Sequence, residues 1–282
     1  MNPTARDIIE HSWEQRAEFG PAHAPRELVV SVEETLERLD AGTLRVAERG
    51  AQGWRVHEWL KKAVLLYFRT HDNALMSAGY THFYDKVPLK YSGATELELR
   101  SGGARIVPPA VVRKGAYVAP GVVLMPSYVN VGAYIDSGTM VDTWATVGSC
   151  AQIGADVHLA GGVGVGGVLE PVQARPVVVE DGAFIGSRCI LTEGVLIGER
   201  AVLAPNVSLT GSVPVIDVTG PEPVEHRGYV PPYSVVVPGT RPKEFPAGTY
   251  QLSCALIIGH RNEQTDLKTS LNDVLREYEI GV

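Results

Sequence analysis

Between residues 106 and 209 an aliphatic residue recurs at every sixth position apart from one five-residue step and one interruption, and this period constrains the fold more than any other feature of the sequence. A period of six is neither the 3.6 of a helix nor the simple alternation of a strand, and self-similarity at a fixed period indicates a solenoid. The aliphatic positions fall in three uninterrupted runs: Ile106, Val112, Val118, Leu124; Val129, Ile135, Val141, Val147, Ile153, Leu159, Val165; and Val179, Ile185, Leu191, Ile197, Leu203, Leu209.

The period also predicts how each repeat folds. Each hexad would form one short strand and one corner, with its aliphatic side chain pointing inward. The fourth residue after the aliphatic is usually small or aliphatic, as at Ala145, Ala151 and Cys189, which suits corners that crowd one another. Three hexads would close one triangular coil, and the coils would stack by parallel strand pairing around a continuous core. We therefore expect a mainly β protein, a parallel β-helix whose flat faces favour self-association.

Three regions are expected along the chain. Residues 1–105 are predicted to form a mainly helical N-terminal domain, residues 106–237 the β-helix, and residues 238–282 a C-terminal region of strands and a helix. The period is interrupted at 166–178 and 217–228. Both segments are predicted to be loops, because the first is too long for a corner and the second is rich in Pro and Gly.

Shorter patterns predict the elements at the two ends of the chain. Thr4 and Asp7 resemble an N-cap residue and its acid at N3, followed by apolar residues at helical spacing. Between residue 69 and about Arg105 only loops are expected. The other predicted elements are helices at 26–39, 58–68 and 269–278, a hairpin that joins 44–48 to 54–57, and strands at 234–237 and 250–258.

Composition excludes several classes of partner. The formal net charge of −7 argues against a nucleic acid held by a general basic surface. No apolar run approaches the length of a membrane span, and the N-terminal residues lack the apolar segment of a signal peptide. Cys150, Cys189 and Cys254 are an odd number of cysteines without paired spacing, which favours a reducing compartment. We expect a cytoplasmic protein with no membrane or nucleic-acid partner.

Two motif-like features are interpreted as structural. Gly162, Gly164 and Gly167 satisfy G-x-G-x-x-G, but they lie within the six-residue period and are not followed by a predicted helix, so a dinucleotide site is disfavoured. His158 is the only histidine between His82 and His226, and a metal site needs several converging ligands. No metal site is therefore expected.

Acidic residues follow the inward aliphatic at several corners. Asp136 and Asp142 lie one hexad apart, and Glu193 precedes Gly194 at a similar corner. Asp favours turns, so spacing alone favours corner roles for these acids over a functional carboxylate at a groove. Arg105 directly precedes the first hexad, where packing against the domain junction is a sufficient explanation.

Several long strings give these positions a different meaning. The chain closely resembles the 2,3,4,5-tetrahydropyridine-2,6-dicarboxylate N-succinyltransferase family of hexapeptide-repeat acyltransferases, with a nearly continuous likeness from about residue 3 to 200. The strings that carry the resemblance are LKKAVLL (60–66), YDKVP (84–88), RIVPP (105–109), LMPSYVN (124–130), VDTWATVGSCAQIG (141–154) and GGVGVGGVLEP (161–171).

The resemblance implies a fold and a reaction. The fold would be a left-handed parallel β-helix, assembled as a homotrimer with active sites between neighbouring subunits. The reaction would transfer succinyl from succinyl-CoA to the amine of hydrated, ring-opened tetrahydrodipicolinate. The product, N-succinyl-2-amino-6-oxopimelate, belongs to the diaminopimelate and lysine pathway. Succinyl-CoA would be a co-substrate, no cofactor would be permanently bound, and the partners would be small molecules.

The resemblance also implies roles for particular residues. Arg105 would grip a substrate carboxylate, and Asp142 would bind the substrate amine and take part in catalysis. Glu193 would be the catalytic base. CoA is expected near Gly186 and Ala204.

The chain departs from the family pattern at two places. Ile190 occupies a position that is acidic in other members, and the sequence diverges after Leu203, where CoA contacts are expected. Two other functional classes therefore stay open. One is another hexapeptide acyltransferase, using acetyl-CoA or a sugar amine, and the other is a non-catalytic scaffold. Turnover with succinyl-CoA and with acetyl-CoA separates the acyltransferases from each other, and a scaffold is expected to bind no CoA at all.

Overall fold

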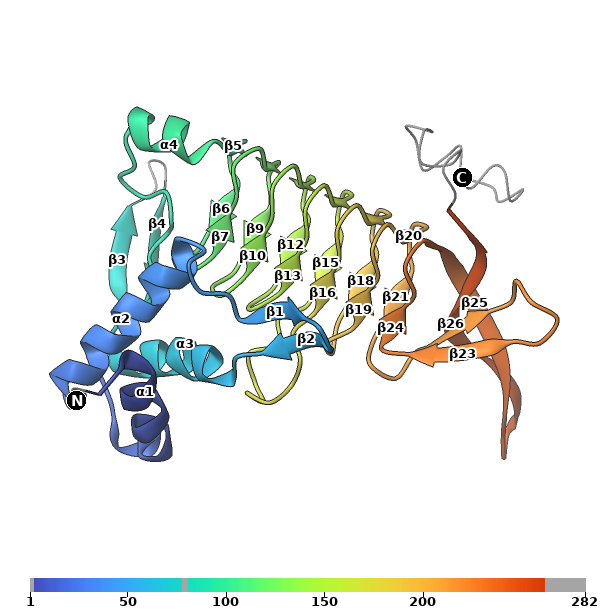
Figure 1. Ribbon diagram of the computed structural model, residues 1–282, viewed down its shortest axis with the longest axis horizontal. Coiled ribbons are helices and arrows are strands. Elements are labelled where there is room, and N and C mark those ends of the chain that lie inside the picture. The colour runs from blue at the N-terminus through green and yellow to red at the C-terminus, as the bar shows by residue number, and fades with distance from the viewer. Residues whose placement is uncertain (1–2, 78–80, 262–282) are drawn as a thin grey trace.

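The computed structural model describes residues 3–77 and 81–261. Its N-terminal region packs three helices around one apolar cluster, which includes Ile9, Leu28 and Leu60. The predicted N-cap is confirmed: Thr4 and Asp7 form a reciprocal capping box, with the Asp7 amide donating to Thr4 Oγ1. The helical elements are α1 (Ala5–Glu14), the short 3-10 helix η1 (Arg16–Glu18), α2 (Arg26–Asp40) and α3 (Glu58–Thr70) (Figure 1).

Two short hairpins lie in the N-terminal region, one between α2 and α3 and one after α3. From the sequence, a hairpin is expected at the first place and loops at the second. The hairpin is confirmed as β1 (Ala47–Gly50) paired with β2 (Gly53–Val56). The expectation of loops up to Arg105 was wrong, because β3 (Ala74–Ser77) pairs with β4 (His82–Asp85) and α4 spans Glu96–Gly102. A second capping box, between Thr95 and Glu98, starts α4. Its S/T-x-x-E pattern is a helix-start signal visible in the sequence.

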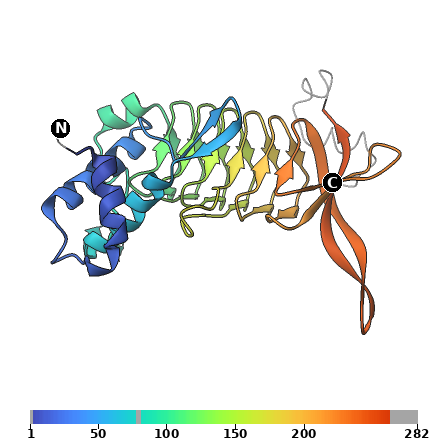
Figure 2. The same ribbon diagram turned by 60° about the horizontal axis from the view of Figure 1, so that its bottom comes forward.

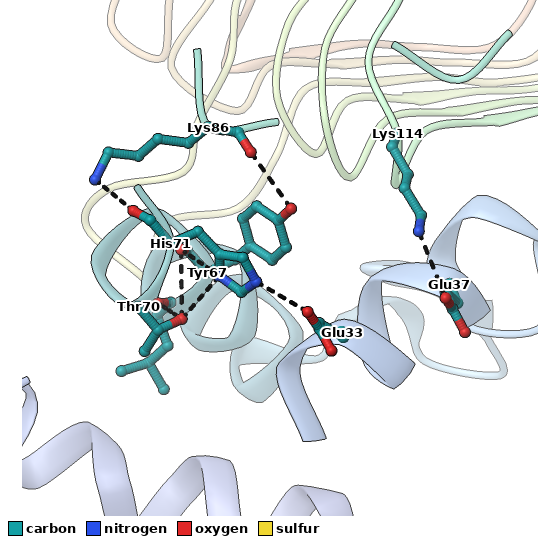
Figure 3. A network of polar contacts seen from close by, with 8 residues as sticks. Glu33, Glu37, Tyr67, Thr70, His71, Lys86 and Lys114 are labelled. Atoms are coloured by element: carbon teal, nitrogen blue, oxygen red, sulfur yellow. Dashed lines mark hydrogen bonds and ion pairs between the residues drawn. The ribbon is translucent and has the colours of Figure 1, made fainter. Parts of the chain in front are cut away.

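Polar contacts fix the helical region to the chain that follows it. Tyr67 Oη donates to the Lys86 carbonyl, and Lys86 Nζ donates to the His71 carbonyl at 2.8 Å (Figure 3). The His71 ring lies 3.2 Å from a Glu33 oxygen, and Lys114 forms an ion pair with Glu37 of α2. Helices α2 and α3 are thus tied both to each other and to the first coil of the β-helix.

The hexads form the left-handed parallel β-helix. Every aliphatic of the three runs is the second residue of a two-residue strand, and those from Val112 onward are buried. Consecutive strands fall on three sheets in turn. The β5 sheet contains β5 (Arg105–Ile106), β8 (Val123–Leu124), β11 (Met140–Val141), β14 (His158–Leu159), β17 (Phe184–Ile185) and β20 (Val202–Leu203). The β6 sheet contains β6 (Val111–Val112), β9 (Tyr128–Val129), β12 (Thr146–Val147), β15 (Gly164–Val165), β18 (Ile190–Leu191) and β21 (Ser208–Leu209). The β7 sheet contains β7 (Tyr117–Val118), β10 (Tyr134–Ile135), β13 (Gln152–Ile153), β16 (Val178–Val179), β19 (Leu196–Ile197) and β24 (Tyr229–Val230).

The coils continue past the last predicted hexad. Val230 of β24 and Val236 of the next strand are six residues apart, and both are fully buried. Sequence reasoning ended the series at Leu209 because residues 210–228 separate it from Val230. The expected loop at 217–228 was wrong in form: β22 (Pro214–Asp217) and β23 (Val224–Arg227) make an antiparallel hairpin. The segment at 166–177 is an irregular loop, as expected.

Two long strands close the described part of the chain. Strand β25 (Ser234–Phe245) joins the β5 sheet beside β20 and pairs antiparallel with β26 (Gly248–His260). The expected strands at 234–237 and 250–258 are confirmed and are longer than predicted. The distal half of this hairpin is largely exposed and projects away from the β-helix (Figure 2). The predicted terminal helix at 269–278 lies outside the described residues.

Candidate active site

The N-terminal hairpin covers one sheet of the β-helix. Trp54 Nε1 donates to Glu180 at 2.8 Å, and Arg45 Nε donates to Gln152 at 2.7 Å. The Arg45 guanidinium also lies 3.8 Å from the centre of the Tyr134 ring. These contacts cover the outer face of the β7 sheet. The β5 and β6 sheets and the corners that bound them are not covered by this hairpin.

Asp142 lies at the corner where strand β11 of the β5 sheet turns toward the β6 sheet. We call the column of such corners the β5–β6 edge (residues 142–145, 160–163, 186–189 and 204–207). One Asp142 oxygen accepts from the backbone N–H and the hydroxyl of Thr143, at 2.6 and 3.1 Å. The other oxygen lies 3.7 Å from His158 Nε2. Asp142 is thus oriented by hydrogen bonds from Thr143 in the same corner, and its other oxygen is directed toward the His158 ring.

His158, to which sequence reasoning assigned a structural role alone, lies beside the predicted site residue Asp142. It is the outward residue of β14, in register with Met140 of β11, and its ring lies 4.9 Å from that of Phe184. The signal was available, because residues three hexads apart lie side by side on adjacent coils. His158 follows Met140 by three hexads, and Asp142 begins the corner beside them.

Arg105 is exposed as the outward residue of β5, at the N-terminal end of the same sheet. It lines a shallow depression of about 410 Å³ beside α4, together with Glu96 and Arg100. Paired strands lie about 4.8 Å apart, so two coils separate β5 from the Asp142 corner by about 10 Å along the helix axis. No side-chain hydrogen bond or ion pair of Arg105 is found within residues 3–77 and 81–261, which leaves its guanidinium available to an anion.

Gly186 and Ala204 follow Asp142 along the β5–β6 edge, in later coils. A Cβ at Gly186 would lie 2.6 Å from the Leu203 carbonyl and the Pro205 nitrogen, so only glycine fits there. Both residues are buried, and the exposed groups beside them are Arg188 and Asn206. Arg105, Asp142 and the predicted CoA positions thus follow one another along one surface of the molecule.

Glu193 lies on a different edge. It follows strand β18 of the β6 sheet, at the corner that turns toward the β7 sheet, which we call the β6–β7 edge. It is exposed and has a positive φ of 54°, and one carboxylate oxygen accepts from the Gly211 amide at 3.2 Å. The whole β6 sheet separates Glu193 from Asp142. One chain therefore does not bring these two predicted catalytic residues together.

The cysteines offer no nucleophile. All three are free and buried, and burial raises the pKa of Cys150 and of Cys189 to about 12. Within the described ranges, no group of three or more His, Cys, Asp or Glu side chains converges as a metal site would require. Among the described helices, none has the length and apolar character needed to cross a membrane.

The fold and the comparisons with known proteins together place the chain among the hexapeptide-repeat acyltransferases. The model of a hexapeptide repeat of succinyl-transferase matches residues 176–211, and that of the tetrahydrodipicolinate N-succinyltransferase N-terminal region matches residues 4–70. The chain belongs to the 2,3,4,5-tetrahydropyridine-2,6-dicarboxylate N-succinyltransferase family.

Full-length relatives support this membership. The chain is 55% identical to the enzyme of that name from Bordetella pertussis, over 98% of this chain and 100% of the relative. It is 52% identical to the enzyme from Ralstonia nicotianae, over 98% and 99%. The likeness therefore extends into the region after Leu203.

A solved structure supports the fold. A Campylobacter jejuni protein described as a 2,3,4,5-tetrahydropyridine-2-carboxylate N-succinyltransferase superposes with a TM-score of 0.51 at 15% identity, over 82% of this chain and 63% of that one.

Proposed function

We propose that this chain transfers a succinyl group from succinyl-CoA to the amine of hydrated, ring-opened tetrahydrodipicolinate, the acylation step of the succinylase route to diaminopimelate and lysine. The observation that carries the proposal is the alignment along one surface of exposed Arg105, half-buried Asp142 and the corners that contain Gly186 and Ala204, in a chain at least half identical to relatives with that name. Succinyl-CoA is a co-substrate, and no permanently bound cofactor is required. The three free cysteines support a cytoplasmic location.

Arg105 and Asp142 bind the acceptor in this proposal. A guanidinium binds a carboxylate through two parallel hydrogen bonds, which suits one end of a dicarboxylate substrate. Asp142 receives the amine, and its hydrogen bonds from Thr143 keep the carboxylate in one orientation. The separation of about two coils, roughly 10 Å, matches an extended acceptor that spans both residues.

Glu193 removes the proton in the bond-forming step. The neutral amine adds to the thioester carbonyl, the C–N bond forms, and the amine proton passes to the Glu193 carboxylate. Collapse of the tetrahedral adduct breaks the C–S bond, and the proton held by Glu193 passes to the departing sulfur, so that CoA leaves as the thiol and the carboxylate is restored. General-base catalysis of this kind contributes on the order of 10²–10⁴-fold.

We infer that the enzyme is a homotrimer whose sites lie between chains. Asp142 and Glu193 lie on the two edges that bound the β6 sheet, so a second copy must supply one of them to each site. The outer face of this sheet supports the inference. Trp144 is 68% exposed at its boundary, Ile190 is 42% exposed and Tyr128 is 37% exposed, and the outward residues carry no charge. An uncharged surface with exposed aromatic and aliphatic side chains is typical of an interface.

Release of free thiol tests the proposal. Succinyl-CoA and acetyl-CoA are compared as donors, with tetrahydrodipicolinate as acceptor. Turnover with succinyl-CoA well above that with acetyl-CoA is the expected result. Preference for acetyl-CoA would replace the donor in the proposal, and no thiol release from either donor would leave the scaffold alternative.

A further inference from the structure

A buried cation in the N-terminal region contacts the long loop of the β-helix. Lys61 of α3 is fully buried, and its Nζ donates to the carbonyls of Ala174 and Pro171, at 2.8 and 3.1 Å. Burial lowers the pKa of Lys61. Among the described residues no carboxylate forms an ion pair with Lys61, so its hydrogen bonds come from the loop carbonyls, and the negative charge of Glu58 also favours its charged form. An arrangement this costly fixes the position of loop 166–177 relative to α3.

Arg175, the residue after Ala174, contacts the β-helix on the other side of the loop. Arg175 Nε donates to the Gly194 carbonyl at 2.9 Å, and its Nη2 lies 3.4 Å from the Gly228 carbonyl. The Arg175 backbone also lies against Gly194, where a Cβ would come within 2.3 Å of the Arg175 oxygen. Gly194 has a φ of +70°, so glycine is required there both sterically and conformationally.

These contacts converge on the corner that carries Glu193. Glu193 itself has a left-handed φ of 54°, a backbone conformation that surrounding structure must maintain in a residue with a side chain. On one side Arg175 binds the next carbonyl along the chain. On the other side the Gly211 amide donates to the Glu193 carboxylate, and Gly211 lies against Gly228, the second residue whose carbonyl Arg175 approaches.

We propose that Arg175, anchored through its loop by Lys61, is a positioning residue for Glu193. The inference rests on the proposed function, because it assumes that Glu193 is the base. Arg175 acts through the backbone: its guanidinium fixes Gly194 and Gly228, and thereby the strained corner and the amide that orients the carboxylate. Lys61 belongs to α3, so the folded N-terminal region contributes to the geometry of a site on the β-helix.

A double-mutant cycle in the full-length enzyme tests this inference. Arg175→Ala is expected to lower kcat at least tenfold while KM for both substrates changes less than twofold, because the proposal gives Arg175 a role in orienting Glu193 and none in binding either substrate. In a Glu193→Gln background the same substitution should have no further effect on kcat. Arg55→Ala, at an exposed arginine of β2, is the matched control for loss of a charge, and the thermal midpoint is measured for every variant.

The outcomes separate the two proposals. Wild-type turnover in Glu193→Gln would overturn the role of the base, and with it the positioning role. A slow Glu193→Gln together with a wild-type Arg175→Ala, or an equal loss from Arg175→Ala in both backgrounds, would overturn the positioning role alone. Lys61→Met tests the anchor by the same cycle, and a folded variant with wild-type kcat would remove Lys61 from the inference. If Lys61→Met does not fold, the Arg175 cycle still decides.

Discussion

The outer faces of the β7 and β6 sheets differ although their strands share length, parallel pairing and an inward aliphatic ladder. On the β7 sheet, Gln152 and Val178 are fully buried, and the N-terminal hairpin binds this sheet through Arg45, which contacts Gln152, and Trp54, which contacts Glu180. On the β6 sheet, the equivalent outward positions include exposed Tyr128, Thr146, Ile190 and Ser208.

This difference shows that the inward and outward residues of one repeat have separate structural roles. The inward residue of each hexad determines that a coil forms, and it is the same type on every sheet. The outward residue determines what covers the sheet. A segment of the same chain covers the β7 sheet, whereas the β6 face is uncharged and uncovered in one chain, and we propose that a second copy covers it. The two edges of this uncovered face carry Asp142 and Glu193, which links assembly to chemistry.

The largest expected effects come from placing a glutamate on the outer face of each of the two sheets in turn. Val178→Glu places an unpaired carboxylate under the hairpin, so we expect a loss of about 3–5 kcal/mol in the free energy of unfolding. Ile190→Glu places the same group on the uncovered face, so the folded chain should persist while the trimer dissociates. Chemical denaturation and sedimentation velocity measure the two effects. An intact trimer in Ile190→Glu would contradict the assignment of this face.

A smaller effect is expected at the acceptor end of the β5 sheet. Arg105→Ala removes a charge-assisted hydrogen-bonding group worth about 1.5–3 kcal/mol, so kcat/KM for the acceptor should fall by roughly ten- to a hundredfold. The KM for succinyl-CoA should stay within twofold, and the trimer should remain intact. Steady-state kinetics with each substrate varied in turn measures this. Unchanged acceptor kinetics would remove Arg105 from the site.

The smallest expected effect concerns two buried cysteine thiols, one beneath the part of the β-helix that the helical region covers and one inside the uncovered β5–β6 edge. Cys150 lies under the helical region and Cys189 lies inside the β5–β6 edge, yet burial raises the pKa of both thiols to about 12. Neither should react with iodoacetamide at pH 8 in the native protein. The unfolded chain loses these protons near pH 9 and the folded chain retains them, so stability should fall as pH rises from about 9 to 12. Rapid alkylation of native Cys189 would show that this edge is loosely packed.

Most of the fold follows from the sequence because the period of six is fixed by the interior. Ile153, Leu159 and their equivalents need the same environment in every coil, so they recur without exception. The continuation at Val230 and Val236 was missed because an inserted hairpin displaces it along the chain. Helix α4 was missed although Thr95 and Glu98 form a capping box, since the region lacks a strong apolar period.

The candidate site was predictable only in part. Residues three hexads apart are neighbours on adjacent coils, which places His158 beside Met140 and so next to Asp142. The same counting puts Glu193 on another edge, so both positions could be predicted from the period. The contacts of Lys61 and Arg175 were not, because they depend on how an irregular loop packs against a helix more than a hundred residues earlier. Which sheet the N-terminal hairpin covers also depends on such tertiary contacts.

The central claim is that each site takes Asp142 from one chain and Glu193 from another. Asp142→Ala and Glu193→Gln chains, each with a different tag, are expressed separately and together, and doubly tagged trimers are isolated. Every trimer that contains both kinds of chain has an intact Asp142 opposite an intact Glu193 at one of its three interfaces, so the mixed trimers should recover about a third of wild-type turnover. Mixed trimers no more active than either parent would contradict a site shared between chains.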